Sequence, residues 1–432
     1  MDRPARTGGD GAPAVNDVRA LAALAGHHLD RTVLGTVRDV HRGVADRVFR
    51  AVPGSTPVRW AHDAISATVY GAVGLGVRTL AVATDTIVEV AAGEREVRWL
   101  DGSPGRRASQ AVLHGIVGDG FATAHPELDL PVRIRVDDRD VPLEPPAIAT
   151  AFPDARRRVA VLLHGLTESE RSWDLPARER RRPEGTDAVV LPDVLTELGW
   201  TPVRVRYGTG RAVGVNGVEL AELLEALLEA WPQPVDELAL VGHSMGGLVI
   251  RAACAVGEAA DHRWLARVGH TVHLGTPHLG SWLERAAHRG AGVLKRFPET
   301  SAFGRILDTR ARGIKDLRHG ALDDAAWGEG VLGPDGTGDL DGLPVGVGAT
   351  AELPPLPAGA THHLVAGRLT RSPDHPVTRV LGDLLVTVPS ATGRDGRREL
   401  TGGRLVVLEL PAGHFRLLRD PLVADHLRQH LA

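Results

Sequence analysis

The segment at residues 238–247, LALVGHSMGG, restricts the fold of this chain more than any other stretch of its 432 residues. An apolar, strand-like run leads into the segment, and a helix-compatible stretch follows it. Gly242 and Gly246 lie two residues before and two residues after Ser244. In a sharp strand–turn–helix connection, side chains at these two positions would collide with the neighbouring strand and helix. The segment therefore predicts a tight turn that exposes the hydroxyl of Ser244.

Short apolar runs alternate with helical patterns from about residue 126 to the C-terminus. The predicted strands are residues 159–163, 202–205, 238–241, 271–274, 364–366 and 405–410. Between the second and third of them, a leucine-rich run at residues 220–231 predicts an amphipathic helix. Before them, apolar residues at 132, 134 and 136 predict a further strand, with residues 141–143 as its hairpin partner. This alternation predicts the α/β class, with a mainly parallel sheet covered by helices on both faces.

The chain is expected to have three regions. Residues 1–14 are expected to be disordered. Residues 15–125 form a helical N-terminal region, in which valines recur at helical spacing between residues 33 and 48. Residues 126–432 form the α/β domain. Within that domain, residues 281–360 do not fit the alternation, and an insertion of this length predicts a lid or cap over the site.

Charge and cysteine content exclude some classes of protein. The net charge of −4 gives no reason to expect a nucleic-acid partner. Cys254 is the single cysteine, so that no intramolecular disulfide exists, which suits a reducing compartment; we expect it to be buried on the helix after Ser244. The most apolar stretch, residues 64–92, contains three charged residues and falls short of the roughly 18 uncharged residues of a membrane span. The first fifteen residues lack the apolar core of a signal peptide.

These observations predict a cytoplasmic protein. The basic run at residues 178–182, RERRR, is interpreted as a solvated loop. The alternative, that this run contacts anionic head groups at a membrane surface, stays open, and so does the oligomeric state.

His414 is the candidate base for Ser244. An unactivated serine is a weak nucleophile, and it needs a base and an orienting acid, which follow it in the order Ser, Asp, His in this kind of fold. His414 lies in the sequence PAGHF, just after the last predicted strand and before the C-terminal helix. A loop at that place can bring an imidazole over the strand ends. The other C-terminal histidines fit less well. His362 and His363 precede a strand, and His426 and His430 fall in the terminal helix, where they are expected at the surface.

The acid is one of two aspartates after the strand at residues 364–366. Asp383 lies in the segment GDLLVTV, whose apolar flank would bury the carboxylate and preserve its pairing with an imidazole. Asp374 lies between prolines and a histidine, in what reads as an exposed loop. Asp383 is therefore the preferred acid.

An oxyanion intermediate needs two preorganised N–H donors. The first candidate is the backbone N–H of Met245, directly after the nucleophile. The second is the N–H of Leu166, in the turn after the strand at residues 159–163. Gly165 permits the tight turn that would point this amide inward. His164 is expected to brace the loop through hydrogen bonds and to take no direct part in catalysis.

Together these motifs resemble the α/β-hydrolase superfamily of serine esterases and lipases over about residues 128–432. The segments HGL, GHSMGG, LGTPHLG, GDLLV and AGHF are similar to those of bacterial triacylglycerol lipases and of relatives of the GPI inositol-deacylase group. In such lipases the acid belongs to an N/G-D-x-x-V segment, which is a second reason for Asp383. Residues 312–318, RGIKDLR, look like the lid segment of a bacterial branch of these hydrolases.

The expected function is hydrolysis of a carboxylic ester, with a small-molecule or lipid ester as the substrate. Acyl transfer or thioester cleavage by the same three residues is an alternative. An alternative of another class is a membrane- or partner-binding protein on an inherited hydrolase scaffold. No cofactor and no metal is expected.

Overall fold

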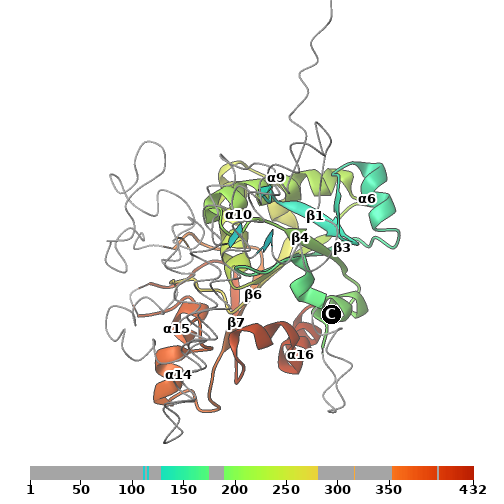
Figure 1. Ribbon diagram of the computed structural model, residues 1–432. Helices are drawn as coiled ribbons and strands as arrows, with labels where there is room; N and C mark the ends of the chain where they lie inside the picture. The colour runs from blue at the N-terminus through green and yellow to red at the C-terminus, as the bar shows by residue number, and fades with distance from the viewer. Residues whose placement is uncertain are drawn as a thin grey trace, which may run out of the picture. The chain divides into compact units, whose positions relative to one another are not determined.

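The computed structural model in Figure 1 describes residues 110–111, 114–115, 128–174, 189–280, 316, 353–396 and 398–432. The chain divides into two compact units, and all of these residues except Leu128 belong to the second. Most of the predicted disordered stretch, helical N-terminal region and insertion lies outside the described residues, as does the basic run at 178–182. No helix within the described ranges is long and apolar enough to cross a membrane.

The centre of the second unit is an eight-stranded sheet with the strand order β2-β1-β4-β3-β5-β6-β7-β8. Its strands are β1 (Arg133–Val136), β2 (Arg139–Val141), β3 (Arg158–Leu163), β4 (Thr201–Arg206), β5 (Glu237–His243), β6 (Val268–Leu274), β7 (Thr361–Gly367) and β8 (Arg404–Leu410). Only β1 pairs antiparallel, with β2 and with β4, and all the other pairs are parallel. The predicted, mainly parallel sheet is confirmed.

The hairpin partner of β1 begins two residues earlier than predicted. Asp137 and Asp138 both have positive φ angles, of 46° and 67°. They form a two-residue connection of the kind that matches the twist of a hairpin, and aspartate tolerates this conformation. Val136 therefore pairs directly with Arg139, and the return strand is β2.

Helices cover both faces of the sheet. The described helices are α6 (Pro145–Ala151), α8 (Leu191–Glu197), α9 (Val213–Ala230), α10 (Met245–Ala259), α14 (Pro376–Leu381), α15 (Val388–Ala391) and α16 (Pro421–His430). Alternate residues of β3, Ala160 and Leu162, pack in one core cluster with α8 and α16. The intervening residues of β3 are equally buried and face the opposite side, where α9 and α10 lie (Figure 1). A strand buried on both faces must be continuously apolar, as β3 is from Val159 to Leu163.

The leucine-rich run predicted as a helix lies in α9 up to Ala230, with Trp231 as the C-cap, and α9 packs closely on α10. A Cβ on Gly217 would lie 2.5 Å from the Cβ of Ala252, so that only glycine permits this approach. Cys254 is buried on α10, and burial raises the pKa of its thiol to about 12. The thiol therefore stays protonated and packs as a small apolar group.

Four histidines pack together near the start of β6 and β7. His270 Nδ1 lies 3.1 Å from His363 Nε2, and His363 Nδ1 lies 2.9 Å from His426 Nε2. The ring of His430 lies 4.6 Å from that of His426, centroid to centroid. The expectation that His426 lies at the surface is wrong: it is buried, because its face of α16 packs on the sheet. His363 lies inside β7 and does not precede it.

Acid is expected to destabilise the fold through this cluster. Burial, with a smaller effect of neighbouring histidines, lowers the pKa of His363 to about 3 and that of His426 to about 4. Unfolded histidine has a pKa of about 6.5, so that between these values the unfolded chain binds more protons than the folded one. Above pH 6.5 these histidines are neutral in both states and do not lower the free energy of unfolding. As the pH drops from about 6.5 to about 4, the free energy of unfolding should fall by on the order of a few kcal/mol. Urea titrations from pH 7 to pH 4 measure this slope.

The variant His426→Gln should flatten that pH dependence. His375→Gln, at an exposed histidine, is the matched control and should leave the slope unchanged. Equal slopes in wild type and His426→Gln would show that the cluster does not carry the acid sensitivity.

Candidate active site

Ser244 lies in the turn between β5 and α10 with a φ angle of +52°, which is rare for a residue other than glycine. A Cβ on Gly242 would lie 2.5 Å from the Gly247 nitrogen, and one on Gly246 would lie 2.5 Å from the Leu163 oxygen. Both glycines are therefore required by close backbone contacts, as the sequence predicts. The N–H of Ser244 donates to the Leu274 oxygen at 2.8 Å, which ties the strained turn to the end of β6.

Asp383 and His414 are in direct contact. His414 Nδ1 lies 2.7 Å from Asp383 Oδ2, and both side chains are almost fully buried. The second carboxylate oxygen, Oδ1, accepts the N–H groups of Leu385 at 3.0 Å and Val386 at 2.8 Å. Asp374, by contrast, has an 82% exposed side chain and pairs with a surface arginine. Of the two candidate acids, the structure brings Asp383 to His414.

The turn after α14 fixes the position of Asp383. Gly382 has a φ angle of +57°, and a Cβ there would lie 1.9 Å from the Val386 oxygen, so that glycine is required. Leu384 also has a positive φ angle, of 99°. The His414 N–H donates to the Asp383 backbone oxygen at 3.0 Å, which joins the acid and the base through their main chains as well.

The Asp383 carboxylate determines which nitrogen of His414 carries the proton. A carboxylate only accepts hydrogen bonds, so that Nδ1 of His414 is the donor and Nε2 keeps a lone pair. The ring lies beside the turn after β6, where a Cβ on Gly275 would come within 3.1 Å of His414 Cε1. Among the described contacts, none joins the Ser244 hydroxyl to His414; in serine enzymes without substrate this contact is often long and tightens on binding.

The two predicted oxyanion donors are buried N–H groups near Ser244. Met245 is the first residue of α10, where the helix leaves its N–H groups without an internal partner. Leu166 lies in the turn 165–168, which the Glu168 N–H closes onto the Gly165 oxygen at 3.1 Å. Within the described part of the chain, the N–H of Leu166 has no hydrogen-bond acceptor.

His164 supports this turn. Its Nδ1 donates to the Gly165 oxygen at 3.0 Å, and its Nε2 accepts the Tyr207 N–H at 3.4 Å. The Tyr207 hydroxyl donates to the His164 oxygen at 2.6 Å, and the two rings are stacked. Burial lowers the pKa of His164, so that the ring is neutral and both nitrogens are satisfied. These contacts agree with the expected bracing role.

Sequence reasoning missed two residues of the site, Glu168 and His243. Glu168 Oε2 accepts the Gly165 N–H at 2.6 Å and lies 3.0 Å from His243 Nδ1. His243 Nε2 lies 3.3 Å from the His414 backbone oxygen. Glu168 follows the HGL motif by two residues, and nothing in its spacing distinguishes it from a surface acid. The pairing becomes visible only when the turn after β3 is placed beside the end of β5.

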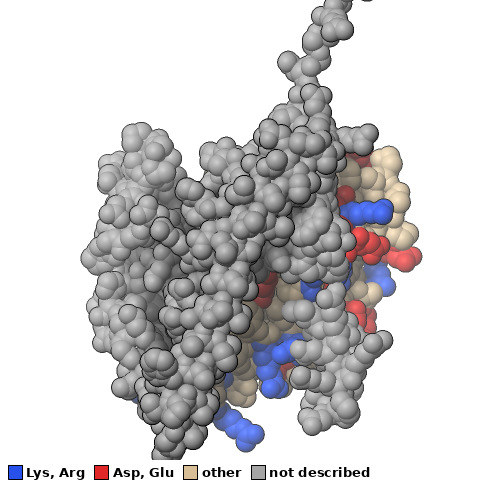
Figure 2. All heavy atoms as spheres, viewed as in Figure 1, with Lys and Arg blue, Asp and Glu red and all other residues tan. Residues whose placement is uncertain are grey.

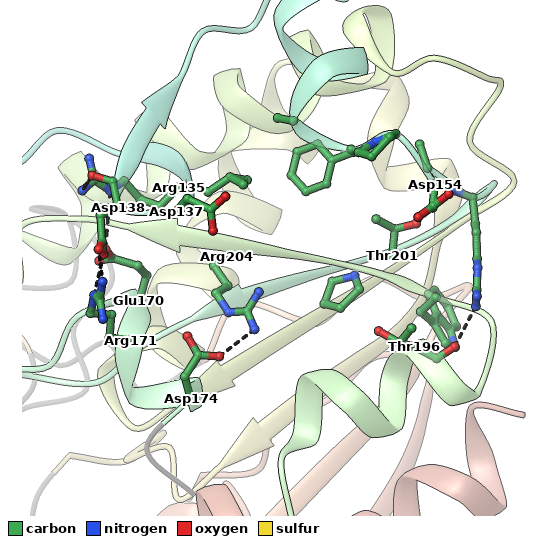
Figure 3. A pocket seen from close by; sticks show the side chains of 18 residues that line it. Arg135, Asp137, Asp138, Asp154, Glu170, Arg171, Asp174, Thr196, Thr201 and Arg204 are labelled. Atoms are coloured by element: carbon green, nitrogen blue, oxygen red, sulfur yellow. Dashed lines mark hydrogen bonds and ion pairs between the residues drawn. The ribbon is translucent and has the colours of Figure 1, made fainter. Parts of the chain in front are cut away.

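A pocket of about 1000 Å³ lies elsewhere on the sheet, along β1, β4 and the loop at residues 151–156 (Figure 3). None of Ser244, Asp383 and His414 lines it. Its charges are mixed and largely paired: Arg204 donates to Asp174 at 2.7 Å, and both signs alternate on the described surface in Figure 2. Nothing in its lining supplies a nucleophile with a base. Over the described ranges, no group of three or more His, Cys, Asp or Glu side chains is arranged to hold a metal ion.

Residues 154–321 match the family model described as "Putative serine esterase (DUF676)". The match contains the turn with Ser244, which the structure places between a parallel strand and a helix of a mainly parallel sheet. The match covers less than half of the chain, and it makes this part of the chain similar to putative serine esterases. This similarity supports a serine hydrolase. Asp383 and His414 lie beyond the matched range, so that their place in the site rests on the geometry above.

Several solved structures match this chain. The mature lipase BlEst2 of Bacillus licheniformis is 17% identical, with a TM-score of 0.38, and the match covers 70% of this chain and 97% of that one. The RedJ thioesterase of the prodiginine pathway in Streptomyces coelicolor is 17% identical, with a TM-score of 0.30, over 64% and 92% of the two chains. The esterase Pf2001 of Pyrococcus furiosus is 14% identical, with a TM-score of 0.33, over 65% and 84%. No curated protein matches the sequence. Similarity at this level does not indicate a substrate.

Proposed function

We propose that this chain is a carboxylic ester hydrolase of the α/β-hydrolase type that forms an acyl-enzyme on Ser244. The observation that carries the proposal is the buried pair of Asp383 and His414, 2.7 Å apart, beside a serine held on a strained turn. A scaffold without catalytic function has no need of a buried carboxylate that fixes the tautomer of a neighbouring imidazole. The interaction-protein alternative is therefore disfavoured.

The first half of the reaction transfers the acyl group to the enzyme. His414 Nε2 takes the hydroxyl proton of Ser244 as Oγ attacks the ester carbonyl. The carbonyl π electrons move onto oxygen, and the N–H groups of Leu166 and Met245 donate to the oxyanion. When the intermediate collapses, the bond to the alcohol oxygen breaks, and His414 returns the proton to the departing alcohol. Losing one such donor costs about 2.7–4 kcal/mol in subtilisin, which sets the expected scale here.

The second half releases the acid. His414 removes a proton from a water molecule, the hydroxide attacks the acyl carbonyl, and the same two N–H groups receive the oxyanion. Collapse breaks the bond to Ser244 Oγ, which regains its proton from His414. Throughout, Asp383 stays ionised and stabilises the imidazolium that His414 becomes.

A panel of p-nitrophenyl esters of increasing chain length tests the proposal, with matched acyl thioesters and with an added alcohol acceptor. We expect ester hydrolysis, with the free acid as the main product. Preferential cleavage of the thioesters, or transfer of the acyl group to the alcohol in place of water, would replace ester hydrolysis by one of the alternatives that use the same residues.

We further propose an apolar acyl group in the substrate, because the predicted lid at residues 281–360 would cover the site; most of that segment lies outside the described residues. Removing residues 328–352, which leaves the buried Leu356 and its backbone bond to Thr401 in place, should lower kcat/KM for long-chain esters several-fold more than for acetate esters, since only a long chain would reach the proposed lid. Parallel chain-length series on both proteins measure this ratio. A proportional loss on all esters would mean that the segment does not select the substrate.

A further inference from the structure

Two hydrogen-bond acceptors enclose His243, directly before Ser244. Its Nδ1 lies 3.0 Å from a carboxylate oxygen of Glu168, and its Nε2 lies 3.3 Å from the backbone oxygen of His414. A carboxylate and a carbonyl accept hydrogen bonds and donate none. Each ring nitrogen must therefore carry a proton for both contacts to be made. His243 in this position is an imidazolium, although it is almost fully buried.

We infer that the Glu168–His243 ion pair has a positioning role. It holds the turn at residues 165–168 and the loop that carries His414 in place relative to Ser244. Glu168 Oε2 also accepts the Gly165 N–H at 2.6 Å, next to the predicted donor Leu166. His243 in turn donates to the main chain of His414. One buried pair thus connects the three segments that supply donor, nucleophile and base. The inference deepens the proposed function and rests on it.

The electrostatics around His243 agree with this geometry. Burial acts to lower the pKa of His243, but the Glu168 carboxylate, the His414 carbonyl and Asp383 raise it above its ordinary value. Burial acts to raise the pKa of Glu168, but the charge and hydrogen bond of His243, the Gly165 N–H and His164 lower it to about 2. Among the described residues, the Glu168 carboxylate also acts on Tyr207, whose pKa is raised by burial and by this charge, and the titratable His414 ring lies beside His243. Phe415, a further close neighbour, presents an uncharged ring.

Two cations must coexist during turnover. When His414 accepts the proton of Ser244, its ring becomes an imidazolium with its centroid 4.8 Å from that of His243. Like charges at this distance repel, and each is compensated by its own carboxylate, Asp383 for His414 and Glu168 for His243. In the wild-type protein the Glu168 charge therefore lets His243 keep its proton, and its bond to the His414 carbonyl, at the stage of the reaction at which His414 is charged. Removal of the Glu168 charge should therefore change kcat more than KM.

The variant Glu168→Gln tests this positioning role. Without the carboxylate, the pKa of His243 falls, and a neutral ring can donate from only one nitrogen. The kcat of the variant should therefore be about twofold below that of wild type at pH 5.5 and roughly 10- to 100-fold below it at pH 8, with KM little changed at either pH. The matched control is Asp236→Asn, which removes a carboxylate from an exposed ion pair with Arg157 and should give a ratio near one at both pH values.

A structural role alone would lower the rate of Glu168→Gln by the same factor at all pH values, and that result would overturn the proposal. Because the variant could fold poorly, ¹⁵N NMR of the His243 ring in the wild-type protein provides a second test. We expect both nitrogens to be protonated at pH 7. A neutral ring at pH 7 would contradict the ion pair even if Ser244 proves to be the nucleophile, so that the two proposals fail separately.

Discussion

Replacement of Ser244 with alanine is expected to lower kcat/KM for ester hydrolysis by about 10⁴-fold or more. The variant lacks the oxygen that attacks the carbonyl, so that no acyl-enzyme forms. The oxyanion donors and His414 stay in place, and they would leave only the weak catalysis that such groups provide without a nucleophile. Steady-state kinetics on a short p-nitrophenyl ester measure the loss.

The fold of Ser244→Ala should be preserved. The strain at this position comes from the φ angle of +52°, and alanine carries the same Cβ as serine. The backbone bond from residue 244 to the Leu274 oxygen is also retained. The urea midpoint should therefore match that of wild type. Ser372→Ala, at an exposed serine, is the control for activity. A variant of residue 244 with most of its activity would rule out this serine as the nucleophile.

Replacement of Asp383 with asparagine is expected to lower kcat by about 10⁴-fold, the loss seen for the equivalent change in a serine protease. The amide oxygen can still accept the N–H groups of Leu385 and Val386, so that the amide NH₂ then faces His414 Nδ1. That group donates a hydrogen bond and favours the tautomer with the proton on Nε2. A ring with its proton on Nε2 cannot accept the proton of Ser244.

Asp374→Asn is the matched control. Its carboxylate is exposed and pairs only with Arg379 across the described contacts, so that kcat should stay within about twofold of wild type. Melting temperatures of both variants separate catalysis from folding. If Asp383→Asn lowers the melting temperature but leaves the rate per folded molecule intact, Asp383 only closes its turn. If Asp374→Asn is the inactive variant, the acid lies in the earlier loop.

Much of the sheet could be predicted because each of the strands β3 to β8 contains a short run rich in apolar residues, with a break in pattern on either side. The six strands predicted between residues 159 and 410 all fall inside β3 to β8 of the structure, with ends that differ by a few residues. The turn at Ser244 was predictable because its two glycines are required by backbone contacts at 2.5 Å. The pairing of Asp383 with His414 could be predicted for a related reason, since a glycine followed by an acid and an apolar flank indicates a buried turn.

Contacts that depend on the packing of distant segments were not predictable. Glu168 reads as an ordinary loop acid until the turn after β3 lies against the end of β5. His426 reads as a polar position of a terminal helix, and it is buried because its face of α16 meets the histidines of β6 and β7. The start of β2 depends on the backbone conformation of Asp137 and Asp138, which a propensity for turns does not specify. In each case the local pattern allows several environments, and tertiary packing selects one.

The most direct test of the central claim is to label the wild-type protein with a fluorophosphonate probe and to locate the adduct by mass spectrometry. The probe phosphonylates a serine only when a base activates its hydroxyl and nearby donors stabilise the negative charge on the phosphoryl oxygen. We expect one adduct per molecule, on the peptide that contains Ser244, and none after Ser244→Ala. An adduct on another residue, or no adduct on protein shown to be folded, would contradict the assignment of Ser244, Asp383 and His414 as the catalytic residues.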